Sequence, residues 1–225
     1  MRFMAALVIL TAVKEDLLPG LEGGPRPEMI WDPTAALMAR IERGEKADGI
    51  FAIDAAMGKL VEAGLIDPAS VVPVVQAEFG IAVSLDMQVP RLDNADDLVA
   101  LLMSVPTICY SRAGASGIYF ESLIDRLGIG DEVRSKSLVI PAGLTAEQVQ
   151  NGRAVLAIQQ MSELRAVPGV RIAGPLPPDC QQTTDFSAGI FTNAAQPRAA
   201  RELIAALTSP KARAAYLARG LQARF

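Results

Sequence analysis

The sequence predicts an α/β fold in which short buried strands alternate with amphipathic helices. Short apolar runs recur along the 225 residues, and helix-period patterns follow most of them. Such alternation implies parallel sheets with right-handed crossovers. A hydrophobic share of 51% and a mean hydropathy of +0.29 suit this fold, and the length allows one domain or two small lobes.

In the first part of the chain, apolar runs bounded by turn residues predict strands at 7–10, 28–31, 49–53 and 79–84. Apolar residues at helical spacing predict helices at 13–21, 35–43 and 55–63. Thr34 stands before the second of these helices, so we expect its hydroxyl to cap it. A Gly- and Pro-rich loop is expected at 23–27.

After Pro90 the same patterns continue. They predict strands at 107–110, 136–140, 155–158, 170–173 and 187–191. They predict helices or helical turns at 94–103, 119–127, 146–151, 163–167, 197–208 and 210–221. Thr145 begins a Thr-x-Glu-Gln sequence that is close to a capping box, so it is expected to cap the helix after it.

The segment 108–128, ICYSRAGASGIYFESLIDRLG, carries the clearest functional signal. A strand runs into Ser111, Arg112 and a Gly- and Ser-containing loop, and a helix follows. Unpaired N–H groups and the macrodipole favour an anion at a helix start, and an Arg fork matches a carboxylate or phosphate. The alternative is a capped turn with a surface Arg112 that pairs with Glu121 or Asp125.

Composition excludes several classes of function. The net charge of -4, the pI near 5.0 and the lack of long basic runs argue against a nucleic-acid partner. The chain has no histidine, which removes the usual general base and imidazole metal ligands. Cys109 and Cys180 lack CxxC spacing, which argues against a zinc or thioredoxin-type site. Cys109 lies in an apolar run and is expected to be a small buried hydrophobic residue. We expect no metal and no cofactor.

The N-terminus has a charge followed by a short apolar run, which superficially resembles a signal peptide. The run is short and lacks a small-residue cleavage site, so a buried first strand is the preferred interpretation. We therefore expect a cytoplasmic protein if this N-terminus is native, and a periplasmic one if residues have been removed. No stretch approaches the length of a membrane span, so the chain is not expected to be membrane-embedded.

The order of these loops resembles the type II periplasmic solute-binding proteins, in their molybdate-binding branch, which includes aconitate-isomerase-like members. The resemblance covers nearly the whole chain. The segments that carry it are ARIERGEKADGIFAIDAAMGKLVEAGLI (39–66), YSRAGASGIYFESLIDRLGI (110–129), NGRAVLAIQQMSEL (151–164) and VRIAGPLPPDCQQTTDFSAGIF (170–191).

The resemblance implies a two-lobed α/β fold with a ligand cleft between the lobes. Lobe 1 would hold 1–82 and 185–225, and lobe 2 would hold 83–184. Closure on a ligand would be a hinge motion near 81–84 and 183–188.

The resemblance also implies where a ligand would bind. Molybdate-binding members hold a tetrahedral oxyanion with hydroxyls, backbone N–H groups and a tyrosine. Their first hydroxyl matches Thr11, and the tyrosine position falls at Gln159 or Gln160, one of which is expected to face the cleft. The predicted ligand-binding residues are Thr11, Lys14, Thr34, Ser111, Arg112, Ala115, Ser116, Gly117, Gln159 and Gln160.

Departures from the molybdate pattern favour an organic di- or tricarboxylate. The tyrosine is lost, while Arg112, Lys14 and two amides are gained, and these suit carboxylates better than a metal oxyanion. Asp54 and Glu163 are interpreted as structural partners of backbone N–H groups rather than as catalytic carboxylates, and Tyr110 and Tyr119 as packing residues.

Two functions remain open at this point. The first is a solute-binding protein that closes on a small anion, with an ABC transporter permease as partner if it is exported. The second is an aconitate-isomerase-like enzyme that shifts a double bond by proton transfer. Its base would be Lys14, a carboxylate such as Glu163 or a tyrosine, and the sequence does not choose among them.

Overall fold

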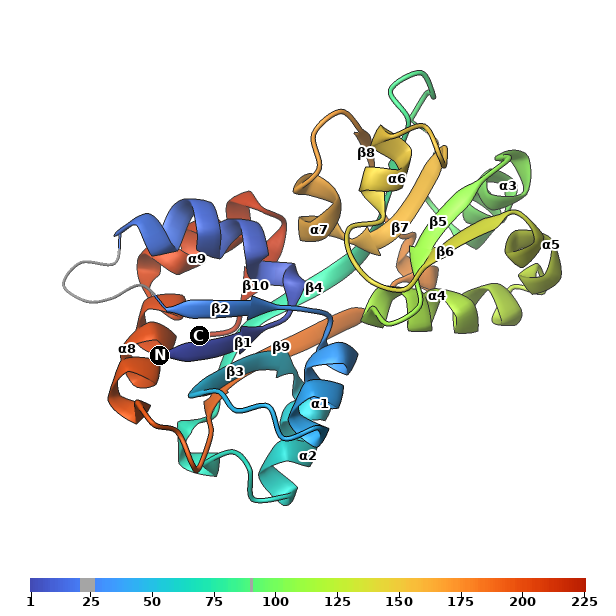
Figure 1. Ribbon diagram of the computed structural model, residues 1–225. Coiled ribbons are helices and arrows are strands. Elements are labelled where there is room, and N and C mark those ends of the chain that lie inside the picture. The colour runs from blue at the N-terminus through green and yellow to red at the C-terminus, as the bar shows by residue number, and fades with distance from the viewer. Residues whose placement is uncertain (21–26, 90) are drawn as a thin grey trace. The chain divides into compact units, whose positions relative to one another are not determined.

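The computed structural model describes residues 1–20, 27–89 and 91–225, which form two compact units (Figure 1). Unit 1 contains Met1–Ala77 and Thr184–Phe225, and unit 2 contains Glu78–Thr183. Two strands, β4 (Val72–Val83) and β9 (Thr183–Ile190), carry the chain across the boundary. The expected loop at 23–27 and the end of the expected helix at 13–21 fall mostly outside the described residues.

The sheet of unit 1 has the strand order β2-β1-β3-β9-β4, with β10 on the far side of β4. Strands β2, β1 and β3 are parallel, and β9 runs antiparallel to β3. These strands are β1 (Arg2–Ala5), β2 (Glu28–Trp31), β3 (Gly49–Ile53) and β10 (Leu221–Ala223).

Helices cover both faces of this sheet (Figure 1). Phe3 and Phe51 point to one face, while Met4 and Ile50 point to the other, as the alternation of a strand requires. One face packs against α1 (Thr34–Glu42) and α2 (Asp54–Glu62). The other packs against α8 (Pro197–Leu207), α9 (Pro210–Ala218) and a helical stretch after β1. That stretch comprises the 3₁₀ turn Leu7–Ile9, the π-helix Ala12–Leu17 and the 3₁₀ turn Leu18–Gly20.

Unit 2 has its own sheet, in the order β8-β4-β7-β5-β6. Strand β5 is parallel to both β6 and β7, whereas β4 is antiparallel to β7 and β8. The strands are β5 (Ile108–Ser111), β6 (Ser137–Ile140), β7 (Leu156–Gln160) and β8 (Arg171–Pro175).

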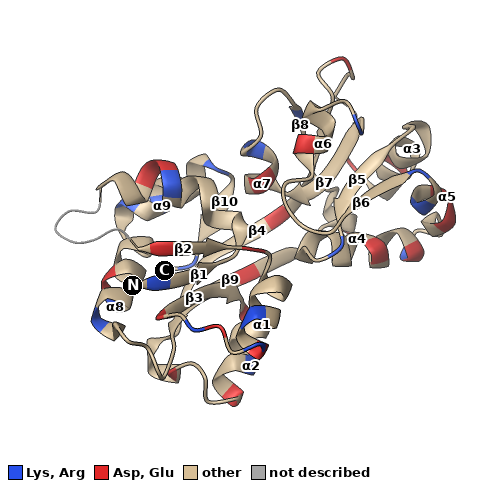
Figure 2. Ribbon diagram, viewed as in Figure 1, with Lys and Arg blue, Asp and Glu red and all other residues tan. Residues whose placement is uncertain are grey.

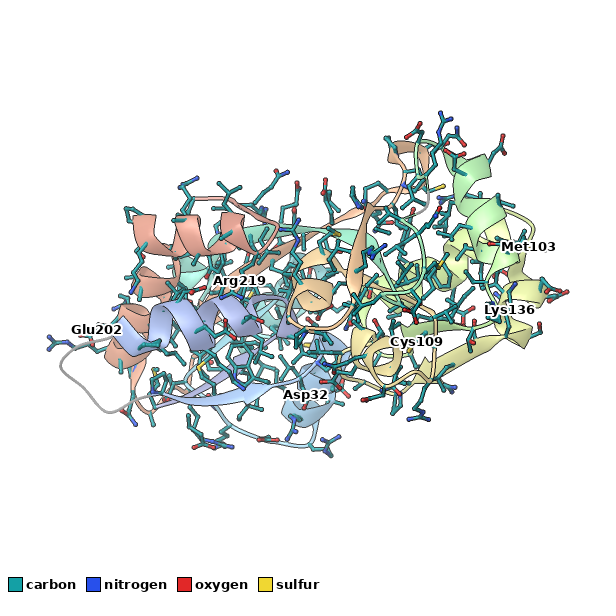
Figure 3. The ribbon with its side chains drawn as sticks, turned by 90° about the horizontal axis from the view of Figure 1, so that it is seen from above. Asp32, Met103, Cys109, Lys136, Glu202 and Arg219 are labelled. Carbon is teal, nitrogen blue, oxygen red and sulfur yellow. The ribbon has the colours of Figure 1, made fainter. Side chains whose placement is uncertain are left out.

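The helices of unit 2 also lie on two faces. One face carries α3 (Ala95–Ser104), α4 (Ala115–Arg126) and α5 (Gly130–Ser135), and the other carries α6 (Ala146–Gln150) and α7 (Met161–Arg165). The ammonium of Lys136 donates to the Met103 carbonyl at 2.8 Å, which ties β6 to the end of α3 (Figure 3). Short 3₁₀ turns occur at Pro68–Ser70 in unit 1 and at Pro178–Cys180 in unit 2.

The structure corrects the expected first strand. Residues 7–10 are helical, and the strand is β1, which ends at Ala5. A short apolar run fits a buried helix as well as a buried strand, so its composition could not distinguish the two.

Two expected helix caps are also wrong. Thr34 is the first residue of α1, and Pro33 occupies the cap position. Thr145 does precede α6, but its side chain makes no capping bond and its hydroxyl instead donates to the Ile158 carbonyl.

The parallel pairing that the alternation implies holds for only part of each sheet. Strand β4 begins at Val72 rather than at 79, and both β4 and β9 run antiparallel to their neighbours. Helix α5 and strand β10 were not expected. By contrast, β2 and β3 match their expected ranges residue for residue.

Charges of both signs lie close together on the same elements, as on α5 in Figure 2.

Cys109 and Cys180 are both buried and are not bonded to each other, and the burial of Cys109 was expected. Within the described residues, no helix has the length and apolar character needed to cross a membrane.

Candidate functional site

Three parallel strands of unit 1 end at the same edge of its sheet. Strands β1, β2 and β3 end at Ala5, Trp31 and Ile53, and a helical segment begins shortly after each. The residues that precede these segments, Ala6, Pro33 and Ile53, supply no side-chain cap. Because helix starts carry N–H groups without internal partners, this edge suits an anion.

Lys14 reaches this edge, although it comes from the helix after β1. Its ammonium lies over the ring of Trp31, 5.9 Å from the ring centroid, and Trp31 is the last residue of β2. Thr11 lies in the same helical stretch, with φ -69° and ψ -45°, more than one turn beyond Ala5. The expected place of Thr11 directly after a strand is therefore wrong, and its contact with a ligand stays a prediction.

Thr34 stands at the end of a neighbouring strand. Its hydroxyl oxygen accepts from the backbone N–H of Ile53 at 3.4 Å, which links the start of α1 to the end of β3. Asp32, labelled in Figure 3, precedes it and accepts from the Arg40 guanidinium at 2.8 Å. The edge therefore holds both hydroxyl and charged groups.

A cluster around Asp54 completes the unit 1 edge. Asp54 follows β3, and its Oδ1 accepts from the Ser187 hydroxyl at 2.7 Å. Its Oδ2 accepts from Nη1 of Arg224 at 2.9 Å. Arg224 also pairs with Asp185 at 3.4 Å, and Gln76 donates to Asp185 at 2.8 Å. Asp54 was expected to pair with backbone N–H groups, whereas the side chains of Ser187 and Arg224 bind its carboxylate, and sequence reasoning missed Arg224.

In unit 2, the loop at the start of α4 packs tightly against the end of β5. Ser111 is 1% exposed, and among the described residues its hydroxyl oxygen has no hydrogen-bond partner. A Cβ at Gly114 would meet that oxygen, and a Cβ at Gly117 would meet the Ser111 carbonyl. Gly117 thus has a steric role besides its predicted place in the binding loop. Ser116 is buried beside them.

Arg112 is exposed, and its backbone N–H donates to the Ile140 carbonyl at 2.8 Å. Its expected alternative partners, Glu121 and Asp125, are instead bound by Arg134 at 2.8 and 2.6 Å. No other carboxylate in the described parts of the chain lies within ion-pair distance of Arg112. Its guanidinium is therefore available to an anion at the start of α4.

The two glutamines of β7 have different roles. The amide oxygen of Gln159 accepts from the N–H and the hydroxyl of Thr145, at 2.7 and 2.9 Å. Its Nε2 donates to the Gly143 carbonyl at 2.9 Å. Gln159 therefore holds the loop before α6, and its contact with a ligand stays a prediction. Gln160 lies on the opposite face of β7, and its amide has no hydrogen-bond partner within the described ranges.

Glu163 lies buried in the first turn of α7. Burial raises the pKa of its carboxyl to about 8. Hydrogen bonds from the Gln160 backbone N–H and the Gln159 side chain lower this pKa, but by less than burial raises it. The expected bond to a backbone N–H is present. No cation contributes to this pKa shift, so the carboxyl holds a proton at neutral pH.

The predicted binding residues thus fall into two groups. Thr11, Lys14 and Thr34 belong to unit 1, and the other seven belong to unit 2. Unit 2 also contains two surface hollows of about 620 and 610 Å³, one beside Gln181 and one beside Lys136. No predicted binding residue lines either hollow. The cleft between lobes stays a prediction.

This architecture is the fold of the two-lobed periplasmic binding proteins. The molybdate-binding protein of Azotobacter vinelandii superposes with a TM-score of 0.80 at 18% identity, over 98% of each chain. AgtB from A. tumefaciens R10, solved in complex with agropinic acid, superposes with a TM-score of 0.73 at 12% identity, over 99% of this chain and 82% of the other. These likenesses establish the fold.

Sequence comparison establishes the family. Residues 27–222 match the model for bacterial extracellular solute-binding proteins, and the chain belongs to that family. It is also 32% identical to an aconitate isomerase from Pseudomonas sp. over 213 residues, which cover 94% of this chain and 78% of that protein.

Proposed function

We propose that this protein binds a tricarboxylate and isomerises aconitate by moving a proton along its carbon chain. The observation that carries the proposal is the 32% identity to aconitate isomerase across 94% of the chain. The likeness to the molybdate-binding protein, at 18% identity, supports only the fold.

The charged groups of the site support a carboxylate ligand. Arg112 in unit 2 has no carboxylate partner among the described residues, and Lys14 in unit 1 lies over an aromatic ring at a strand end. A guanidinium binds a carboxylate through two parallel hydrogen bonds. Each of these cations can therefore bind a carboxylate on its own unit.

The unpartnered hydroxyl of Ser111 supports a polar ligand at the start of α4. A buried hydroxyl without a partner costs free energy, so such groups usually have a function or a missing partner. A carboxylate oxygen bound at the start of α4 would supply that partner. Gln160 can add an amide on the same unit.

Isomerisation is tested by proton NMR of cis-aconitate incubated with purified protein. We expect the vinyl resonance of trans-aconitate to grow at a rate proportional to protein concentration. Heat-denatured protein is the control for uncatalysed conversion. A spectrum that stays at the uncatalysed rate for hours would contradict the enzymatic proposal.

A thermal-shift screen separates ligand classes in the same preparation. We expect cis-aconitate, trans-aconitate and tricarballylate to raise Tm, and molybdate and tungstate to leave it unchanged. Stabilisation by tricarboxylates without turnover would indicate a solute-binding protein that delivers its ligand to an ABC transporter permease. Stabilisation by molybdate and tungstate alone would contradict the carboxylate proposal.

A further inference from the structure

The proposed isomerisation needs a base beside an acidic C–H bond, and the structure excludes most candidates. The chain has no histidine. Burial raises the pKa of the Cys109 thiol to about 12. The three tyrosine hydroxyls are engaged elsewhere, since Tyr110 donates to Glu121, Tyr119 to the Cys180 carbonyl and Tyr216 to the Leu207 carbonyl.

The two other candidate bases that the sequence analysis names, Glu163 and Lys14, are also poorly suited to remove a proton. Glu163 is buried and carries a proton at neutral pH. The Lys14 ammonium lies over the Trp31 ring, 5.9 Å from its centroid, where a cation–π contact holds it. Lys14 therefore suits the binding of a carboxylate better than the removal of a proton.

Asp54 has the geometry of a positioned base. It stands directly after β3, at the edge where Thr34 meets Ile53, and its side chain is 39% exposed. The Ser187 hydroxyl donates to one carboxylate oxygen and Arg224 to the other. Each oxygen is held by one hydrogen bond and retains a lone pair, so the carboxylate is fixed but not saturated.

The partners of Asp54 come from distant parts of the chain. Ser187 is buried in β9. Arg224 follows β10, where its guanidinium also donates to the Phe186 carbonyl at 3.3 Å and pairs with Asp185. A base oriented by a second and a third group is the arrangement that proton-transfer sites share. Asp32 at the same edge differs, because both contacts from Arg40 fall on one of its oxygens.

We propose that Asp54 is the catalytic base, with Ser187 and Arg224 as its positioning residues. This inference rests on the proposed isomerase function. The Asp54 carboxylate takes a proton from the methylene carbon of aconitate, and the electron pair of the broken C–H bond delocalises over the allylic carbons and the adjacent carboxylates. The protonated Asp54 carboxyl, whose side chain is 39% exposed, exchanges its proton with solvent and gives a proton to the other end of the allylic system, so the double bond moves without a redox partner.

The decisive experiment follows aconitate in D₂O by proton NMR, with wild-type protein, Asp54→Asn and Glu62→Gln. Glu62 is exposed at the other end of α2 and serves as the matched control. We expect Asp54→Asn to slow both isomerisation and deuterium incorporation by about 100-fold or more, and to keep its affinity for tricarballylate. Glu62→Gln should match wild type.

A second variant covers the case in which Asp54→Asn does not fold. Ser187→Ala keeps the carboxylate and its ion pair but removes the bond to Oδ1. We expect kcat to fall about 10-fold with KM little changed, and Ser187→Thr to restore most of it. An unchanged kcat in Ser187→Ala would contradict the positioning role.

The outcomes distinguish this inference from the proposed function. If wild-type protein neither isomerises aconitate nor exchanges its protons, the proposed function fails. If wild type is active and folded Asp54→Asn is equally active, the assignment of the base is overturned. Loss of exchange in Asp32→Asn with normal exchange in Asp54→Asn would place the base on Asp32.

Discussion

Gly117 packs so closely against Ser111 that position 117 has no room for a side chain. A Cβ there would overlap the Ser111 carbonyl group and lie 3.3 Å from the Ser111 nitrogen. This approach brings the first turn of α4 onto the end of β5. The glycine that a sequence-based analysis assigns to ligand binding is thus needed first to build the loop.

Replacing Gly117 with Ala should therefore destabilise the protein by about 1–3 kcal/mol, because backbone atoms cannot move aside as a flexible side chain can. Urea unfolding measures the loss. Gly58→Ala, in α2, is the control, since nothing lies within 4 Å of the added carbon. It should be neutral or stabilise by up to about 1 kcal/mol. Equal stability of Gly117→Ala and wild type would refute the clash.

The Gln159 amide gives a second stability prediction. Gln159→Met keeps the side-chain volume but leaves the Thr145 N–H and the Gly143 carbonyl without their partner, while the Thr145 hydroxyl keeps the Ile158 carbonyl. We expect a cost of about 1–3 kcal/mol for each buried group left unpaired, read from urea unfolding. Gln222→Met, exposed on β10, should cost little. A small effect at both positions would show that the Gln159 bonds do not matter.

The sequence predicted two of the three parallel strands of unit 1, misplaced β1, and predicted the crossing strands poorly. Strands β2 and β3 are short apolar runs bounded by turn residues, and both match their predicted ranges. Strand β4 contains Pro73 and Glu78, which interrupt the apolar pattern, so only its second half was predicted. The direction of β4 and β9 depends on tertiary pairing, which no local pattern encodes.

The site residues also differ in how far the sequence could predict them, according to whether their contacts are local or distant in the chain. The loop at 111–117 could be predicted because a strand, small residues and a helix follow one another in sequence. The pair Arg224 and Asp54 could not, because 170 positions separate its members and only folding brings them together. The bonds of Gln159 could not be predicted, because its partners Gly143 and Thr145 lie on a loop whose path the sequence does not reveal.

Glu163 should make stability depend on pH. Its pKa is about 8 in the folded protein, above the ordinary value of 4.5, so the folded state holds the proton more tightly than the unfolded chain does. Its contribution is complete below about pH 4.5 and is lost as pH rises through 8. Between these values the free energy of unfolding should fall by at most about 1.4 kcal/mol per pH unit.

Glu163→Gln should remove this slope, so that its stability relative to wild type rises from pH 6 to pH 9. Urea unfolding across that range measures it. Glu147→Gln, an exposed substitution on α6, should keep the wild-type slope. Parallel pH profiles for wild type and Glu163→Gln would contradict the raised pKa.

Trp31 is the single tryptophan of the chain, so its fluorescence reports on the unit 1 edge. A carboxylate that binds Lys14 should draw the ammonium from the ring and change the emission of Trp31. A titration with tricarballylate tests this. Lys14→Met should abolish the ligand-induced change, whereas Lys59→Met, exposed on α2, should keep it. Unchanged emission in wild type at saturating tricarballylate would remove Lys14 from the site.

Arg112 should provide much of the affinity for a carboxylate. Arg112→Ala removes a guanidinium that has no carboxylate partner in the described structure, so its loss should leave folding intact and weaken tricarballylate binding by about 1.5–3 kcal/mol. Calorimetric titration measures the change. Arg153→Ala is the matched control, because Arg153 is also exposed but precedes β7, at the amino-end edge of the same sheet. Equal losses in the two variants would indicate only general attraction between a cationic surface and an anion, whereas a loss confined to Arg112→Ala would place the carboxylate at the start of α4.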